Sequence, residues 1–171
     1  MAIEATAVDA KSFDELTSRL AIQCLLADYA DAVNRRRWSE LSRLFLEDAK
    51  IALRTLQRQP LELTGPEALG RFIGEVVARF DFFQFVQLNA RLELGPDGDS
   101  ALGRLFVCEY RWEKSAGKWT QVFGVYCDRY RRIDGRWWFA QRAFDPLVAA
   151  GNDGSVVDFQ TPIPAFLAGD A

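Results

Sequence analysis

The chain contains no histidine, and this limits the chemistry that its side chains can perform. Without imidazole, the usual serine–histidine and cysteine–histidine nucleophile pairs are excluded. Most zinc and non-haem iron sites are excluded for the same reason. The cysteines Cys24, Cys108 and Cys127 are odd in number and far apart, so they predict reduced, buried thiols rather than disulfides. Acid–base chemistry would then fall to Asp, Glu, Tyr, Lys, Cys or water.

Tyr29 is the candidate hydroxyl donor, because it lies on an apolar helical stripe that is expected to face inward. The stripe consists of Ile22, Leu25, Leu26, Tyr29 and Val33. From this position the hydroxyl could polarise a ligand carbonyl or stabilise an oxyanion. Alternatively, Tyr29 is a core tyrosine whose hydroxyl bonds the main chain.

Two carboxylates within the predicted strands, Asp128 and Glu109, are candidate proton acceptors. Asp128 and Arg142 occupy interior positions of neighbouring strands and could pair across the sheet. Such a pair is commonly structural, but an Asp with a raised pKa in an apolar cavity could serve as a general base. We treat Glu109 as a similar candidate.

Strand alternation decides which further side chains could face a ligand. If Phe85 faces a cavity, so do Gln87 and Asn89, and Tyr126 shares a face with Asp128. For the strand that follows Asn89, the sequence leaves two choices: Phe106, Cys108 and Tyr110, or Val107, Glu109 and Arg111. We expect the ligand-binding side chains to be Phe85, Asn89, Glu109, Tyr110 and Tyr126.

Helices are predicted in the first half of the chain. Ser12 with Glu15 forms a capping box that starts a helix running to about Val33. A short second helix is expected over 38–46, followed by strands over 49–55 and 61–63. Gly65-Pro66 begins a third helix, because Pro is favoured in the first turn.

Strands dominate the second half. Four long strands are predicted over 83–94, 101–113, 119–132 and 136–144, separated by short turns. Such connections favour an antiparallel meander. Helices first and strands later indicate an α+β fold, in which the sheet can curl around the helices into a cone.

Size and composition favour one folded domain. The 171 residues are 49% hydrophobic, 13% aromatic and carry a net charge of −3. We expect a flexible leader over 1–11, the domain over 12–146, and a tail over 147–171 that could cover the pocket. The negative charge argues against nucleic acid as a partner. The sequence lacks an apolar run long enough for a membrane span and a signal-peptide pattern, so we expect a cytoplasmic protein.

Several short motifs occur in a recognisable order. They are residues 26–34, Trp38, Leu44-Phe45, Gly65-Pro66, Asn89, 126–128, 134–137 and Arg142. This series resembles the SnoaL-like branch of the nuclear-transport-factor-2-like superfamily, over roughly residues 15–145. The branch includes scytalone dehydratase, bile-acid dehydratases, polyketide cyclases and ketosteroid isomerases. The resemblance implies a cystatin-like cone, in which a curved antiparallel sheet packs on N-terminal helices.

The acid–base pair that the resemblance implies is absent from this chain. Dehydratases of the family pair an Asp with a His, and here those positions hold Asn34 and Phe85. The resemblance retains Tyr29 as an oxyanion donor, while the carboxylate position of the isomerases falls near Leu53. Asn34 could orient a ligand oxygen but could not remove a proton. Alternatively, it is an Asn that ends the helix.

The leading hypothesis is a pocket that binds an apolar, ring-containing molecule and transforms it by proton transfer without a cofactor or metal. Dehydration, isomerisation and cyclisation are the candidate reactions. Tyr29 and Asn34 would polarise a ligand oxygen, and Asp128 or Glu109 would move the proton. The alternatives are a binding protein without catalysis, and an assembly subunit resembling the β-subunits of ring-hydroxylating oxygenases. A homo-oligomer, dimer or trimer, is expected through the open sheet face.

Overall fold

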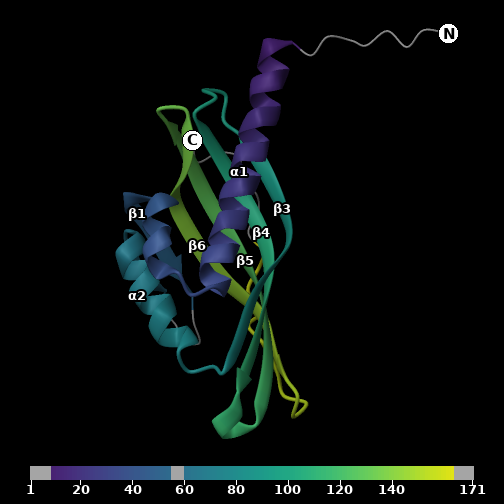
Figure 1. Ribbon diagram of the computed structural model, residues 1–171. Coiled ribbons are helices and arrows are strands. Elements are labelled where there is room, and N and C mark those ends of the chain that lie inside the picture. The colour runs from purple at the N-terminus through teal and green to yellow at the C-terminus, as the bar shows by residue number, and fades with distance from the viewer. Residues whose placement is uncertain (1–8, 55–59, 164–171) are drawn as a thin grey trace, which may run out of the picture.

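Helices cover one face of a single curved sheet (Figure 1). The computed structural model describes residues 9–54 and 60–163. The helices are α1 (Ala10–Asn34), α2 (Pro66–Val77) and the short 3₁₀ helices η1 (Trp38–Arg43) and η2 (Lys114–Ala116). The strands are β1 (Phe45–Leu53), β2 (Leu61–Thr64), β3 (Phe82–Leu94), β4 (Ser100–Glu113), β5 (Lys118–Ile133), β6 (Arg136–Gly151) and β7 (Val156–Asp158). The predicted α+β cone is confirmed.

The sheet has the order β2-β1-β6-β5-β4-β3, with β7 also paired to β6. The predicted meander of four long strands is confirmed, because β3 to β6 pair antiparallel in sequence order. The sheet as a whole is mixed, since β1 runs parallel to β6. The segment from β2 to β5 lies between these two strands in the sequence, so no local turn could reveal their relative direction.

Helix α1 begins earlier than predicted. Its N-cap is Asp9, whose carboxylate accepts a hydrogen bond from the Ser12 amide at 2.8 Å. Ser12 is therefore inside the helix, and the predicted Ser12 cap is wrong. Asp and Ser are about equally good N-caps, so the sequence offered two starting points three residues apart. The last two residues of the predicted leader are helical, and residues 1–8 lie outside the described part of the chain.

The inward stripe of α1 is confirmed: Ile22, Leu26, Tyr29 and Val33 are all buried. They pack against the concave face of the sheet. The predicted second helix is the shorter η1, because the chain at Phe45 already pairs with Phe139 of β6. No helix within the described ranges is long and apolar enough to cross a membrane.

Strand β6 is longer than predicted and includes the first residues of the predicted tail. It passes Phe144, where the expected strand ends, and runs through Pro146 to Gly151. Pro146 is tolerated because a β-bulge interrupts the β5–β6 pairing beside it. At this bulge Gly124 lies against the Phe144 ring, and a Cβ at position 124 would collide with that ring. The tail thus begins as sheet, and residues 164–171 lie outside the described part.

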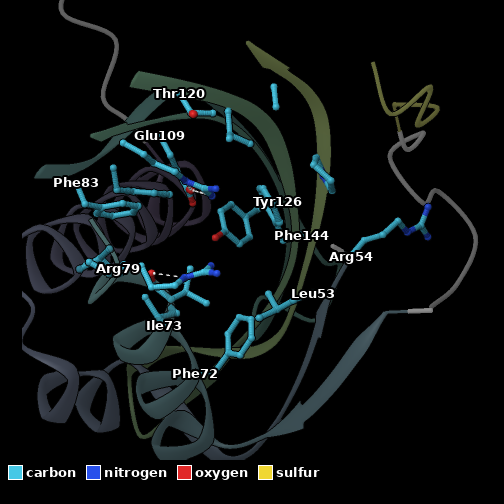
Figure 2. Close-up of a pocket in the computed structure, with 18 of the residues that line it drawn as sticks. Leu53, Arg54, Phe72, Ile73, Arg79, Phe83, Glu109, Thr120, Tyr126 and Phe144 are labelled. Carbon is cyan, nitrogen blue, oxygen red and sulfur yellow. Dashed lines mark hydrogen bonds and ion pairs between the residues drawn. The ribbon is translucent and has the colours of Figure 1, made fainter. Parts of the chain in front are cut away.

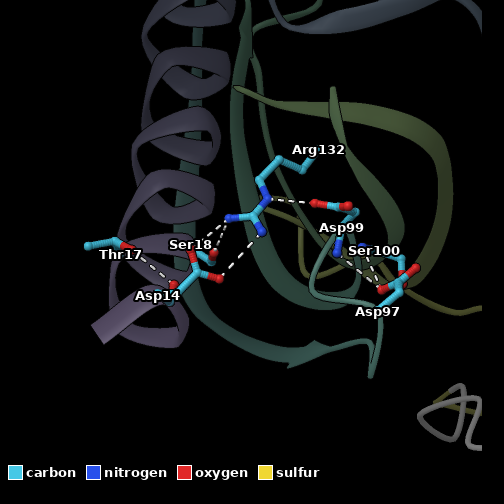
Figure 3. A network of polar contacts seen from close by, with 7 residues as sticks. All are labelled: Asp14, Thr17, Ser18, Asp97, Asp99, Ser100 and Arg132. Carbon is cyan, nitrogen blue, oxygen red and sulfur yellow. Dashed lines mark hydrogen bonds and ion pairs between the residues drawn. The ribbon is translucent and has the colours of Figure 1, made fainter. Parts of the chain in front are cut away.

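Arg132 attaches the first turns of α1 to the sheet (Figure 3). Its guanidinium donates to Asp14 of α1 at 2.9 Å and to Asp99 of the β3–β4 turn at 2.8 Å. These hydrogen bonds raise the pKa of Arg132, and the bond to Asp14 has the larger effect. In the same turn the Asp97 carboxylate accepts from the Ser100 amide at 3.1 Å. One arginine therefore joins the helix, the turn and β5.

Candidate ligand-binding pocket

A pocket of about 450 Å³ lies between α2, the C-terminal half of α1 and the concave face of the sheet (Figure 2). Most of its wall is apolar. The side chains include Val33, Leu53, Phe72, Ile73, Phe83 and Phe144. A cavity of this size and character suits a small apolar ligand.

Two tyrosines that are nearly inaccessible to solvent, Tyr29 and Tyr126, form part of the wall. Their ring centroids are 6.3 Å apart in an edge-to-face arrangement, and Phe85 packs against both rings. Burial raises the pKa of Tyr29, and it raises that of Tyr126 well above 10.0. Both hydroxyls therefore stay protonated at neutral pH and can donate hydrogen bonds.

A buried ion pair between Arg142 and Asp128 packs against the rings of Tyr29 and Tyr126. Arg142 binds Asp128 through two hydrogen bonds of 2.8 Å, and neither side chain is exposed. The guanidinium carbon lies 4.1 Å from the Tyr29 ring centroid and 4.3 Å from that of Tyr126. Tyr130 donates a further hydrogen bond of 2.9 Å to Asp128. The positive charge beside both rings opposes the rise in the pKa of Tyr29 and Tyr126 that burial causes.

Glu109 is the one carboxylate among the described residues that line the pocket. Arg111, two positions along β4, binds it through Nε at 3.0 Å and also through Nη2. Both hydrogen bonds go to Oε2, so Oε1 is the oxygen that could accept a proton from a ligand. Figure 2 places Glu109 beside Thr120, across the pocket from Phe72.

Four of the predicted site residues meet in this pocket: Tyr29, Phe85, Glu109 and Tyr126. Their elements are distant in sequence, since they lie on α1, β3, β4 and β5. The catalytic and binding roles of these residues remain predictions, whereas their common location is a property of the fold.

Asn34 does not line the pocket. Its amide bonds the main chain of Phe85 in both directions, through Nδ2 at 2.9 Å and Oδ1 at 2.7 Å. In this structure both polar atoms of the Asn34 amide are therefore occupied by the main chain and do not face the pocket. The amide joins the end of α1 to β3 instead.

Asn89 and Tyr110, two of the expected ligand-binding residues, do not line this pocket. A β-bulge between Gln87 and Asn89 breaks the alternation of β3, and Asn89 is exposed. On β4 the structure selects the face that carries Glu109 and Arg111. Tyr110, between them, must point to the opposite face.

Asp128 is buried behind the wall rather than within it. The predicted pairing with Arg142 is confirmed by the cross-strand register. Three hydrogen bonds from Arg142 and Tyr130 occupy the Asp128 carboxylate. Because Asp128 does not line the pocket, its placement favours the structural alternative.

The cysteines differ from one another. Cys108 is buried, Cys127 is half-buried and Cys24 is exposed, so the expectation of three buried thiols is wrong for Cys24. Burial raises the pKa of Cys127 to about 11, which keeps its thiol protonated. No three metal-binding side chains come together within residues 9–54 and 60–163.

Three polar residues of the pocket wall were not expected from the sequence: Arg54, Arg79 and Thr120. Arg79 follows the end of α2 and Thr120 lies near the start of β5. Inward alternation from Tyr126 would have reached Thr120. Val157 and Phe159, which lie within the predicted tail, also line the pocket.

The chain belongs to the SnoaL-like domain family, whose model matches residues 14–143. An uncharacterized protein of Mycobacterium tuberculosis is 32% identical over 97 residues, which cover 57% of this chain and 62% of that relative. The match thus spans less than two thirds of this curated relative.

Solved structures resemble the chain over most of its length. The hexachlorocyclohexane dehydrochlorinase LinA-type3 from Novosphingobium barchaimii is 26% identical with a TM-score of 0.73, and the match covers 88% of this chain and 99% of that one. A protein from Novosphingobium aromaticivorans, described as NTF2-like with a cystatin-like fold, is 19% identical with a TM-score of 0.67, covering 88% and 94%. The second likeness shows the fold alone. Family and pocket together support a protein that binds a small molecule.

Proposed function

We propose that the pocket binds an apolar, ring-containing molecule and catalyses a proton-transfer elimination or isomerisation on it. One observation carries the proposal: a carboxylate, Glu109, and two protonated phenols, Tyr29 and Tyr126, line the same largely apolar cavity. An apolar surrounding strengthens hydrogen bonds to developing charge. The likeness to a dehydrochlorinase supports an elimination.

In this mechanism Glu109 Oε1 takes a proton from a ligand carbon. The electron pair of that C–H bond forms a C=C bond, and the leaving group departs with its own electron pair. Tyr29 and Tyr126 would donate hydrogen bonds to a ligand oxygen or to the leaving group as negative charge develops. Arg142 would act through the tyrosines, because it stacks on both rings.

A screen in D₂O tests the reaction. The purified protein is incubated with cyclic compounds that carry a hydroxyl or chloride on the carbon next to an acidic C–H, and products are detected by mass spectrometry. Loss of water or HCl, or uptake of deuterium by the ligand, is expected. Tyr29→Phe should lower turnover about 10²-fold. Full activity in this variant would remove Tyr29 from the mechanism.

The second candidate is binding without catalysis. It is favoured by the ion pair between Glu109 and Arg111, because the guanidinium occupies one oxygen of the only carboxylate in the described wall. Native mass spectrometry of the purified protein would reveal a retained ligand. Recovery of that ligand unchanged after long incubation would favour this candidate, and accumulation of product would exclude it.

Self-association is proposed through the sheet face that points away from the helices. Half-buried aromatic side chains of β4, including Tyr110 and Trp112, stand on this face. Light scattering should give the mass of a dimer or trimer. A monomer at high concentration would refute the proposal.

A further inference from the structure

Positive charge gathers at the pocket of a protein whose net charge is −3. Three arginines, Arg54, Arg79 and Arg111, line the pocket against the single carboxylate of Glu109 in the described wall. Arg54 pairs with Asp145 at 3.1 Å, and Arg111 pairs with Glu109. Two of the three charges are thus compensated within the protein.

Arg79 has no carboxylate partner among the described residues. Its guanidinium carbon lies 5.8 Å from the centroid of the Phe80 ring, and its Nε donates a long hydrogen bond of 3.4 Å to the Val76 carbonyl. Only Nε takes part in this bond, so the two terminal Nη groups remain able to donate to a ligand. A guanidinium presented in this way matches the two oxygens of a carboxylate.

A second arginine of the pocket, Arg111, also lies near the Phe80 ring. The Arg111 guanidinium carbon is 5.4 Å from its centroid, so Arg79 approaches the ring from the segment after α2 and Arg111 approaches it from β4. The apolar side chains of Ile73 and Phe83 line the same pocket as these two arginines. Figure 2 shows Arg79 extending from the α2 side toward the middle of the pocket. The pocket therefore places the positive charge of Arg79 next to an apolar surface.

We infer that the ligand is an amphiphilic acid, with an apolar ring body and one anionic group that Arg79 binds. The inference rests on the proposed function, because it assigns a charge to the ligand of the same pocket. With its anionic group at Arg79, the ring body would lie over Tyr126 toward Glu109. Arg111 is neutralised by Glu109, so Arg79 is the residue that selects for the charge.

Two dyes with the same ring body test this inference. 8-Anilinonaphthalene-1-sulfonate carries one negative charge, and N-phenyl-1-naphthylamine carries none. The wild-type protein should bind the anionic dye more tightly. Arg79→Gln should weaken the anionic dye about threefold to tenfold and leave the neutral dye unchanged. Arg79→Lys should retain part of the preference, since it keeps the charge.

Two further variants make the result decisive. Arg71→Gln removes an exposed arginine of α2 that pairs with Glu67 and lies outside the pocket wall, so neither dye should respond. Ala149→Trp fills the pocket and should abolish binding of both dyes. Equal binding of the anionic dye by wild type and Arg79→Gln, with the neutral dye bound in the pocket, would overturn the charge inference alone. Failure of both dyes to bind would contradict the proposed apolar pocket as well.

Discussion

The side-chain amide of Asn34 forms two hydrogen bonds with the main chain of Phe85. These are the two positions at which the family resemblance implies an Asp and a His. The fold therefore still brings the two positions together, but the contact is now structural. It links the last residue of α1 to an edge strand of the sheet.

Replacement of Asn34 by Ala should destabilise the protein, because the Phe85 N–H and carbonyl lose their partners. The expected loss in the free energy of unfolding is about 1–3 kcal/mol, measured by urea denaturation. Asn89→Ala is the matched control, since Asn89 lies exposed on the same strand. Its effect should stay within about 0.5 kcal/mol. Equal losses in the two variants would contradict a structural role for Asn34.

The buried pair of Asp128 and Arg142 should be sensitive to removal of one charge. Asp128→Asn leaves the Arg142 guanidinium buried without its counter-charge, at a cost of about 3–5 kcal/mol in unfolding free energy. Asp128→Leu combined with Arg142→Met should cost less, since no charge stays buried. A double variant less stable than Asp128→Asn would show that the charge imbalance is not the main cost.

Stability should fall as the pH rises above about 10, because three tyrosines ionise less readily in the folded state. Burial raises the pKa of Tyr29, Tyr126 and Tyr130 above 10.0. Above that pH the unfolded chain loses these protons while the folded chain keeps them, so the unfolded state is favoured. Absorbance at 295 nm should change together with the loss of circular dichroism. Ionisation of all tyrosines in a chain that is still folded would refute this.

Removal of Arg132 should loosen the start of α1. Arg132→Gln breaks the ion pairs to Asp14 and Asp99, so amide hydrogen exchange over residues 13–18 should become faster. Exchange over the C-terminal half of α1, which packs in the core, should not change. Arg131→Gln is the control, because the neighbouring side chain points to the other face of β5. Faster exchange in both variants would argue against a specific link through Arg132.

Patterns within one element predicted the fold well. The spacing of Ile22, Leu26, Tyr29 and Val33 gave the buried face of α1, and Gly65-Pro66 marked the start of α2. Apolar periodicity is imposed by burial of one face, so it survives changes elsewhere in the chain. The parallel pairing of β1 with β6 depends on contacts between distant segments, which no local pattern records.

Strand register explains why the observed pocket wall differs from the expected one. One bulge before Asn89 was enough to turn that side chain out, and the choice between Glu109 and Tyr110 required the position of β4 relative to the helices. The location of Asn34 outside the pocket has a different reason. Its residue type allows a ligand contact and a main-chain contact equally, and only the proximity of Phe85 decides between them.

Glu109→Gln separates catalysis from binding. A glutamine keeps the size of the side chain and can still accept a hydrogen bond from Arg111, but it cannot take a proton. Turnover of a substrate found in the D₂O screen should fall about 10²- to 10⁴-fold, while the neutral dye should bind as in wild type. The anionic dye should bind more tightly, because Arg111 has lost its counter-charge. Glu113→Gln, at the end of the same strand, should change none of the three measurements. Unchanged turnover in Glu109→Gln would rule out this carboxylate as the base, and the described pocket wall offers no other carboxylate to replace it.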